Sequence, residues 1–154
     1  MCHAVEMSNE ERRKIPAAAL LLGCGGLLPF LATPIALGTG RIEGELVFNA
    51  FGAYSAVILS FLGGIRWGQG VGLNKSRARE LTISVAPSLW AWISILIPSP
   101  GLSTIMLMIG FGTMGFLDRY YPSPASPAWM SNLRTLLSII VVGCHGAVAG
   151  FVWF

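Results

Sequence analysis

Five apolar stretches occupy most of this chain of 154 residues, and each is about as long as a bilayer is thick. The hydrocarbon core of a bilayer is crossed by roughly 20 apolar residues in a helix. A backbone surrounded by lipid must satisfy its own hydrogen bonds, which a helix does within one segment. The sequence therefore predicts an all-α fold, a polytopic membrane bundle with five transmembrane helices.

The segments outside these stretches are short. Residues 1–16 carry several charges before the first apolar run, and no cleavage site of a signal peptide follows in a suitable place. We therefore predict a cytoplasmic tail at 1–16 and a single transmembrane domain at 17–154. Hydrophobic residues make up 54% of the chain and charged residues only 11%, a balance that soluble globular domains do not have.

The spans can be placed from the apolar runs and the prolines between them. Pro29 and Pro34 interrupt the first run and predict a kink there. Only residues 98–101 separate the third and fourth runs, so these two helices form a hairpin, with Ser99 as helix cap and Pro100 as first helical residue. The expected spans are Ala17–Leu37, Leu46–Trp67, Leu81–Ile97, Leu102–Leu117 and Leu133–Phe154.

Positive charge is distributed unequally between the two sides of this arrangement. Nine lysines and arginines fall on the side of the amino terminus, and only Arg41 falls on the other. Positive loops stay in the cytoplasm, which puts the amino terminus inside and the carboxyl terminus outside. The nine are Arg12, Arg13, Lys14, Arg66, Lys75, Arg77, Arg79, Arg119 and Arg134.

Two of the spans carry small residues at a spacing of about four. Such stripes let membrane helices approach closely, because helices in lipid associate through van der Waals packing. We expect the second and fifth spans to pack centrally through them, with larger apolar residues facing lipid or a partner. The stripes are Gly52, Ala56, Ser60 and Gly64 in the second span, and Gly143, Gly146, Ala147 and Gly150 in the fifth.

Charged residues gather at the cytoplasmic ends of the spans. Arg66, Asp118, Arg119 and Arg134 are placed to form a collar that joins the second, fourth and fifth helices, a mainly structural role. The basic run containing Lys75, Arg77 and Arg79 is placed to meet anionic lipid headgroups or an acidic partner surface. Together these side chains predict contacts with headgroups or a partner.

His145 lies near the middle of the fifth span, where an ionisable residue marks a possible functional site. A neutral histidine bonded to a neighbouring helix is the favoured interpretation, and a haem or quinone ligand is the less favoured one. Glu45 and Asn49 lie one turn apart at the outer start of the second span. They form either an interfacial anchor or the entrance of a polar track toward His145.

One segment in this chain is similar to a known family signature. Residues 54–68, YSAVILSFLGGIRWG, resemble that of an uncharacterised family of small five-helix membrane proteins that includes mitochondrial transmembrane protein 69. A proline-rich stretch before Trp129, together with Leu133 and Arg134, resembles a second element of that family. The resemblance implies the five-span fold and supplies no activity or active-site residue.

Taken together, the residues favour a non-catalytic accessory or assembly subunit that packs against a larger respiratory or photosynthetic membrane complex. No constellation of serine, histidine and acid, no carboxylates paired within the membrane and no metal-ligand cluster can be assembled from these residues. We therefore predict no enzyme activity, no metal and no cofactor apart from bound lipid. We expect a multi-pass protein of the bacterial inner membrane, with the mitochondrial inner membrane as the alternative, and no nucleic-acid partner. The competing hypothesis is a small oligomeric transporter or channel that uses Glu45, Asn49 and His145.

Overall fold

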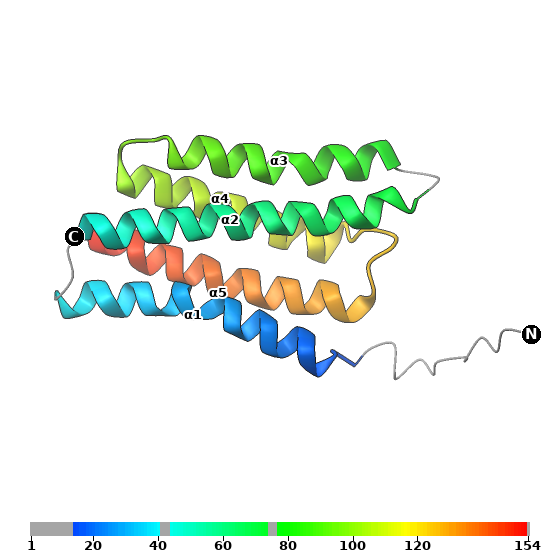
Figure 1. The fold of residues 1–154 in the computed structure, drawn as a ribbon, viewed down its shortest axis with the longest axis horizontal. Coiled ribbons are helices and arrows are strands. Elements are labelled where there is room, and N and C mark those ends of the chain that lie inside the picture. The colour runs from blue at the N-terminus through cyan, green and yellow to red at the C-terminus, as the bar shows by residue number, and fades with distance from the viewer. Residues whose placement is uncertain (1–13, 41–43, 74–76, 154) are drawn as a thin grey trace, which may run out of the picture.

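The computed structural model describes residues 14–40, 44–73 and 77–153, and in these ranges the chain consists of five α-helices (Figure 1). Successive helices run antiparallel, so that α1, α3 and α5 begin at the end of the bundle where α2 and α4 finish (Figure 1). The predicted all-α bundle is confirmed. The helices are α1 (Ala17–Thr39), α2 (Gly44–Val71), α3 (Arg77–Ile95), α4 (Pro100–Tyr120) and α5 (Ala128–Trp153).

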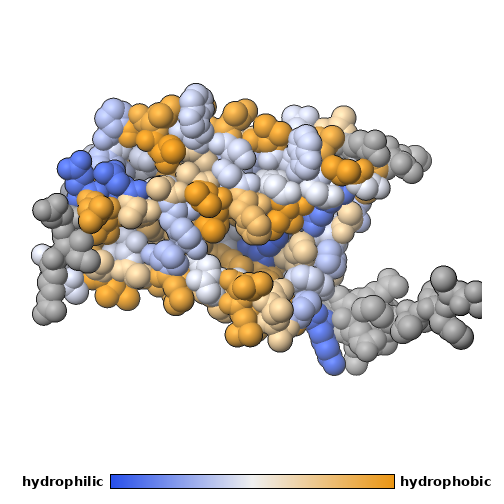
Figure 2. All heavy atoms as spheres, viewed as in Figure 1, coloured by the Kyte–Doolittle hydropathy of each residue, from blue (hydrophilic) through white to orange (hydrophobic). Residues whose placement is uncertain are grey.

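Four of these helices, α1, α2, α4 and α5, are long and apolar enough to cross a membrane. The remaining helix, α3, has 19 residues and a charged first turn that contains Glu80. The chain is thus a multi-pass membrane protein. Figure 2 shows the corresponding surface, on which apolar side chains are spread over the length of the helices.

The helix ends follow the local sequence signals. The hydroxyl of Ser99 accepts a hydrogen bond of 3.4 Å from the backbone amide of Leu102, and Pro100 is the first residue of α4, as predicted. At the same end of the bundle α1 ends at Thr39. The capping residue Gly40 has a φ of 62°, which suits glycine, and its amide donates to the carbonyl of Leu37. Each terminus thereby satisfies one backbone group that the helix itself leaves open.

The first helix bends near its middle, and its amino-terminal half leaves the bundle (Figure 1). Pro29 and Pro34 both lie inside α1. A proline within a helix removes a hydrogen bond and clashes with the carbonyl four residues earlier, which accounts for a bend of this kind. The predicted kink is therefore present, and it opens space between α1 and its neighbours.

Aromatic rings fill the centre of the bundle. Phe30 of α1 is buried and meets Phe51 of α2 and Phe111 of α4 edge to face, at centroid distances of 5.8 and 5.7 Å. Edge-to-face pairs of this kind stabilise a core beyond simple burial. Around them pack buried aliphatic side chains, including Leu59 and Leu107. Ala91 of α3 and Val141 of α5 belong to the same cluster, so the core draws on all five helices.

The glycine stripes do not bring the second and fifth helices together as predicted. The most extensive helix contacts are those of α2 with α3 and of α4 with α5. A Cβ atom built at any of five predicted stripe glycines would meet nothing within 4 Å, so these glycines permit no close contact inside the described part of the chain. They are Gly52, Gly64, Gly143, Gly146 and Gly150. Ala56 is buried, whereas Ala147 is exposed and Ser60 is partly exposed.

Other glycines make the close contacts. A Cβ at Gly63 of α2 would collide with the backbone carbonyl of Ser84 in α3, and one at Gly115 of α4 would lie 2.9 Å from the Cβ of Ser138 in α5. These two positions sit on the two most extensive interfaces. The spacing of glycines predicts the correct type of packing at the wrong positions: Gly63 is adjacent to the predicted Gly64, whereas Gly115 lies on α4, for which no stripe is predicted.

Candidate functional site

Four charged side chains meet inside the bundle and join four helices. The guanidinium of Arg66 lies 3.3 Å from a carboxylate oxygen of Glu80 and 3.4 Å from one of Asp118. Nε of Arg134 donates to the other carboxylate oxygen of Asp118 at 2.7 Å. We call Arg66, Glu80, Asp118 and Arg134 the ionic cluster. It connects α2, α3, α4 and α5 near the end at which α3 and α5 begin.

The ionic cluster is almost entirely shielded from the surroundings. Arg66 and Glu80 are each 1% exposed, and Asp118 and Arg134 are each 6% exposed. The two arginines also donate to backbone carbonyls, Arg66 to Tyr121 at 2.8 Å and Arg134 to Leu62 at 3.3 Å. Since Tyr121 follows the last residue of α4, Arg66 satisfies a carbonyl that this helix end leaves unpaired.

The charges of the ionic cluster balance, with two arginines against two carboxylates. Removing one partner from such a buried group is costly because it leaves an uncompensated charge behind. The cluster is therefore suited to fix the register of the four helices. Its carboxylates are committed to arginines, and among the described residues no group of three His, Cys, Asp or Glu side chains could hold a metal ion.

The predicted charged collar is assembled only in part. Arg66, Asp118 and Arg134 come together, whereas Arg119 is exposed beside them. Glu80, which the sequence analysis did not single out, completes the cluster. The signal that could have found it is the charge count, because two arginines inside apolar spans require two carboxylates and Asp118 supplies only one.

The basic run before α3 is described only in part. Lys75 lies outside the described residues, as does the side chain of Arg77. Arg79 is exposed, and its guanidinium carbon lies 5.9 Å from the ring centroid of Tyr121. A cation over an aromatic face at this distance is attracted to the ring. Contact between this run and lipid headgroups stays a prediction.

His145 lies at the centre of the bundle, enclosed by rings from three other helices. Its ring centroid is 4.6 Å from that of Phe51, 5.3 Å from that of Phe111 and 5.7 Å from that of Phe30. Nδ1 lies 2.8 Å from the carbonyl of Val141, one turn earlier in the same helix. The hydrogen bond is thus made within α5, and not to a neighbouring helix as predicted.

The other ring nitrogen of His145, Nε2, has no hydrogen-bond partner among the described residues, although the side chain is fully buried. If Nδ1 donates to Val141, Nε2 is an acceptor surrounded by aromatic carbon. The free cysteine Cys144 is buried next to it in the chain. The arrangement is a histidine packed as part of an aromatic core, with one acceptor unused.

Glu45 and Asn49 do not join His145. Both are exposed on α2. Asn49 lines a small cavity of about 130 Å³ near the turn between α3 and α4, where Ser103 and Thr104 are also found. The rings of Phe30, Phe51 and Phe111 surround the histidine instead of a polar path, so the predicted track is not assembled in this part of the chain.

Comparison with known proteins gives a family model that matches most of the chain, and relatives that include two vertebrate proteins. The family model described as "Protein of unknown function (DUF3429)" matches residues 15–150. Transmembrane protein 69 of Xenopus tropicalis is 36% identical over 132 residues, which cover 82% of this chain and 51% of that protein. Transmembrane protein 69 of Mus musculus is 31% identical over 130 residues, which cover 81% of this chain and 52% of that protein. The chain therefore spans about half the length of these relatives, and no solved structure matches it.

Proposed function

Since the chain belongs to the DUF3429 family of unknown function, whose members include membrane proteins, we propose that it is a non-catalytic accessory or assembly subunit. In this role it packs within the bilayer against a larger membrane complex, of respiratory or photosynthetic type. The family resemblance carries no reaction or partner. The proposal therefore depends on how the polar and apolar side chains of this chain are distributed.

The observation that carries the proposal is that the described residues form no continuous polar path through the interior. The ionic cluster satisfies its own charges and two backbone carbonyls, and His145 is enclosed by three phenylalanine rings. A transporter needs polar groups that a substrate can reach along a path, and it usually has more than one of them at depth in the membrane. The interior is suited to hold the bundle rigid, so recognition falls to the outer surface.

We further propose that all five helices cross the membrane, with the amino terminus in the cytoplasm and the carboxyl terminus outside. The 19 residues of α3 make a helix of about 28 Å, close to the thickness of the hydrocarbon core. The carboxylate of Glu80 is paired with Arg66 and does not face lipid as a free charge. Lys14, Arg79 and Arg119 all lie at one end of the bundle, which favours this orientation.

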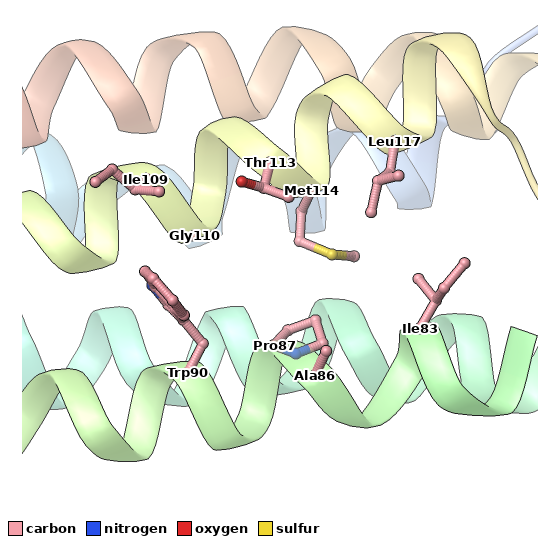
Figure 3. A pocket seen from close by; sticks show the side chains of 9 residues that line it. All are labelled: Ile83, Ala86, Pro87, Trp90, Ile109, Gly110, Thr113, Met114 and Leu117. Carbon is pink, nitrogen blue, oxygen red and sulfur yellow. The ribbon is translucent and has the colours of Figure 1, made fainter.

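A groove between α3 and α4 is the surface best suited to a partner helix. It has a volume of about 270 Å³, and Figure 3 shows Pro87 and Trp90 of α3 across from Gly110 and Met114 of α4. The indole of Trp90 already donates to the carbonyl of Met106 at 2.7 Å.

The groove also contains one polar side chain with which a partner could form a hydrogen bond. Thr113 is exposed in it and makes no hydrogen bond to a described residue. A hydroxyl in an apolar groove can bond to a neighbouring membrane helix, which is a common contact between such helices. We therefore place a hydrophobic transmembrane helix of the larger complex in this groove.

Native purification tests this function. The tagged chain, extracted from its own membranes in mild detergent, should migrate with a large complex on a native gel, and mass spectrometry would identify the other subunits. Ala86→Phe fills the groove and should release the chain from that complex. Val85→Phe adds the same ring at a neighbouring exposed position that does not line the groove, and it should have no effect. Migration of the unmodified chain alone or as a small homo-oligomer would refute the proposal.

The second candidate is a small oligomeric transporter or channel. Nε2 of His145, which has no hydrogen-bond partner among the described residues, favours it, because an acceptor at the centre of a bundle can take part in moving a proton or cation. For this candidate, His145→Phe should abolish flux while leaving abundance unchanged. The accessory role predicts that the same variant still joins the complex.

We propose that the chain works in an energy-transducing membrane. A bacterial inner membrane suits the distribution of lysine and arginine, and the mitochondrial inner membrane is the alternative. Both named relatives come from vertebrates. The partners proposed for either membrane are lipids and the larger complex.

A further inference from the structure

A second cavity, distinct from the α3–α4 groove, lies between α1, α2 and α5. Its volume is about 310 Å³, and its walls are formed by apolar side chains such as Leu22, Phe61 and Leu137. It exists because the amino-terminal half of α1 leaves the bundle at the bend (Figure 1). On the face that Figure 2 presents, a hollow opens between α1 and α2 with hydrophilic surface at its floor.

The length of this cavity corresponds to one leaflet. Along α5 it reaches from Trp129 to Val141, which is about 18 Å of helix. Half of a hydrocarbon core of roughly 30 Å is about 15 Å. The inner end is bounded by Phe30 and Phe111, the rings that also enclose His145. An acyl chain that enters at the level of Trp129 would therefore end near the middle of the bilayer.

One charged side chain, Arg134, lines this cavity. Its Nε and Nη2 donate to Asp118 and to the carbonyl of Leu62, whereas its Nη1 donates to no described residue and is not fully enclosed. Ser138, one turn further along α5, lines the same cavity and makes no hydrogen bond to a described residue. The polar part of the wall thus offers a hydrogen-bond donor.

That donor carries no excess charge, because the ionic cluster has two arginines and two carboxylates. A balanced site has little preference for an anion over a neutral acceptor. This separates it from the exposed basic residues, whose attraction to lipid depends on headgroup charge. The chemistry that suits Nη1 of Arg134 is a neutral carbonyl oxygen attached to a long hydrocarbon chain.

The depth of Arg134 identifies the source of that carbonyl. It is six residues into α5, about 9 Å from the helix end, and α5 with 26 residues is about 39 Å long. A core of roughly 30 Å leaves about 4 to 5 Å of this helix beyond each boundary, so Arg134 lies just inside the boundary. The ester groups of glycerolipids lie at this level of a bilayer.

We propose that the α1–α2–α5 cavity binds one acyl chain of a glycerolipid, whose ester carbonyl accepts a hydrogen bond from Nη1 of Arg134. The lipid belongs to the leaflet at the end of the bundle where α5 begins. Recognition depends on the ester group and the acyl chain of the lipid and does not depend on the charge of the headgroup. The bound chain fills the space that the bend in α1 creates.

Native mass spectrometry of the purified, delipidated protein tests this proposal with three probes. They are dioleoyl phosphatidylcholine, its dioleyl ether analogue, which lacks the carbonyls, and dioleoyl phosphatidylglycerol. The ester should bind about tenfold more tightly than the ether, the gain expected of a hydrogen bond to a charged donor. The two ester lipids should bind within about twofold of each other.

Two variants at neighbouring positions of α1 locate the site. Ala19 lines the cavity and Ala18 is exposed and does not line it. Ala19→Phe should abolish binding of the first stoichiometric lipid, and Ala18→Phe should leave it unchanged, while both elute as the unmodified protein does. Equal binding of ester and ether, a strong preference for phosphatidylglycerol, or equal loss in both variants would overturn the proposal. The comparison of ester with ether needs no variant, so it decides even if Ala19→Phe does not fold.

Discussion

Asp118→Asn is the substitution that bears most directly on the ionic cluster. Asp118 accepts from Arg66 at 3.4 Å and from Arg134 at 2.7 Å, and it is only 6% exposed. Asparagine keeps the shape but removes the negative charge, so that two buried arginines face Glu80 alone. Breaking a buried ionic group in this way costs about 3–5 kcal/mol of the free energy of unfolding. That is a large share of a total stability of about 5–15 kcal/mol.

The assay is thermal unfolding of the purified protein in a mild detergent, followed by helical circular dichroism and by the fraction that elutes as a monodisperse species. The matched control is Arg119→Gln, next to Asp118 in the chain but exposed. An exposed charge of this kind contributes about 0–1 kcal/mol, so the control should unfold close to the unmodified protein.

A double variant distinguishes a broken cluster from a general packing defect. Asp118→Asn combined with Arg134→Gln removes one charge of each sign and leaves the Arg66–Glu80 pair. It should be less destabilised than the sum of the two single variants by at least about 1 kcal/mol, because coupled residues are not additive. Two results would refute this prediction. One is an unfolding temperature of Asp118→Asn equal to that of the Arg119→Gln control, and the other is a destabilisation of the double variant equal to the sum of the two single variants.

Two further predictions concern packing. In Gly63→Ala the new Cβ meets the backbone of Ser84, which should lower the free energy of unfolding by about 1–3 kcal/mol. Gly64→Ala has open space around it and should leave the free energy of unfolding unchanged or raise it slightly. Unfolding curves of the two variants in detergent check this, and equal curves would contradict it. His145→Phe loses one hydrogen bond to Val141, but it also removes the buried nitrogen that has no partner among the described residues. Its free energy of unfolding should therefore stay within about 1 kcal/mol of that of the unmodified protein. His145→Ala leaves a cavity, which should cost about 2–4 kcal/mol. The same unfolding assay ranks these two variants, and a phenylalanine variant less stable than the alanine variant would show that the histidine is needed for its polar groups.

The helices themselves could be predicted from the sequence because lipid leaves the backbone few alternatives. All five predicted spans correspond to helices, and the cap at Ser99 was found because serine followed by proline is a strong local signal. Such features depend on neighbours in the chain. They need no knowledge of which helices touch.

The partners of each helix could be predicted only in part. Gly63 and Gly64 are adjacent in the sequence, yet only the first faces another backbone. Which of two glycines makes the contact depends on how far α2 is rotated about its axis. That rotation is set by all the contacts of α2, among them the ion pair between Arg66 and Glu80 of α3. The spacing of small residues in the sequence does not determine it.

The residues of the ionic cluster could likewise be predicted only in part. Arg66, Asp118 and Arg134 could be grouped in advance because all three are charged and lie at span ends. Glu80 was missed because a carboxylate in the first turn of a helix is ordinary in an exposed position, and here it is buried. The surroundings of His145 could not be predicted either, because the phenylalanine rings around it come from three other helices.

A bundle of five transmembrane spans requires that α3 cross the membrane. In a chain without its native cysteines, Gly72→Cys and Ser99→Cys place one thiol on either side of α3, both at exposed positions. A membrane-impermeant maleimide applied to intact cells should label the cysteine at position 99, and it should label the one at position 72 only after permeabilisation. Labelling of both from the same side would contradict the five-span bundle and the orientation that follows from it.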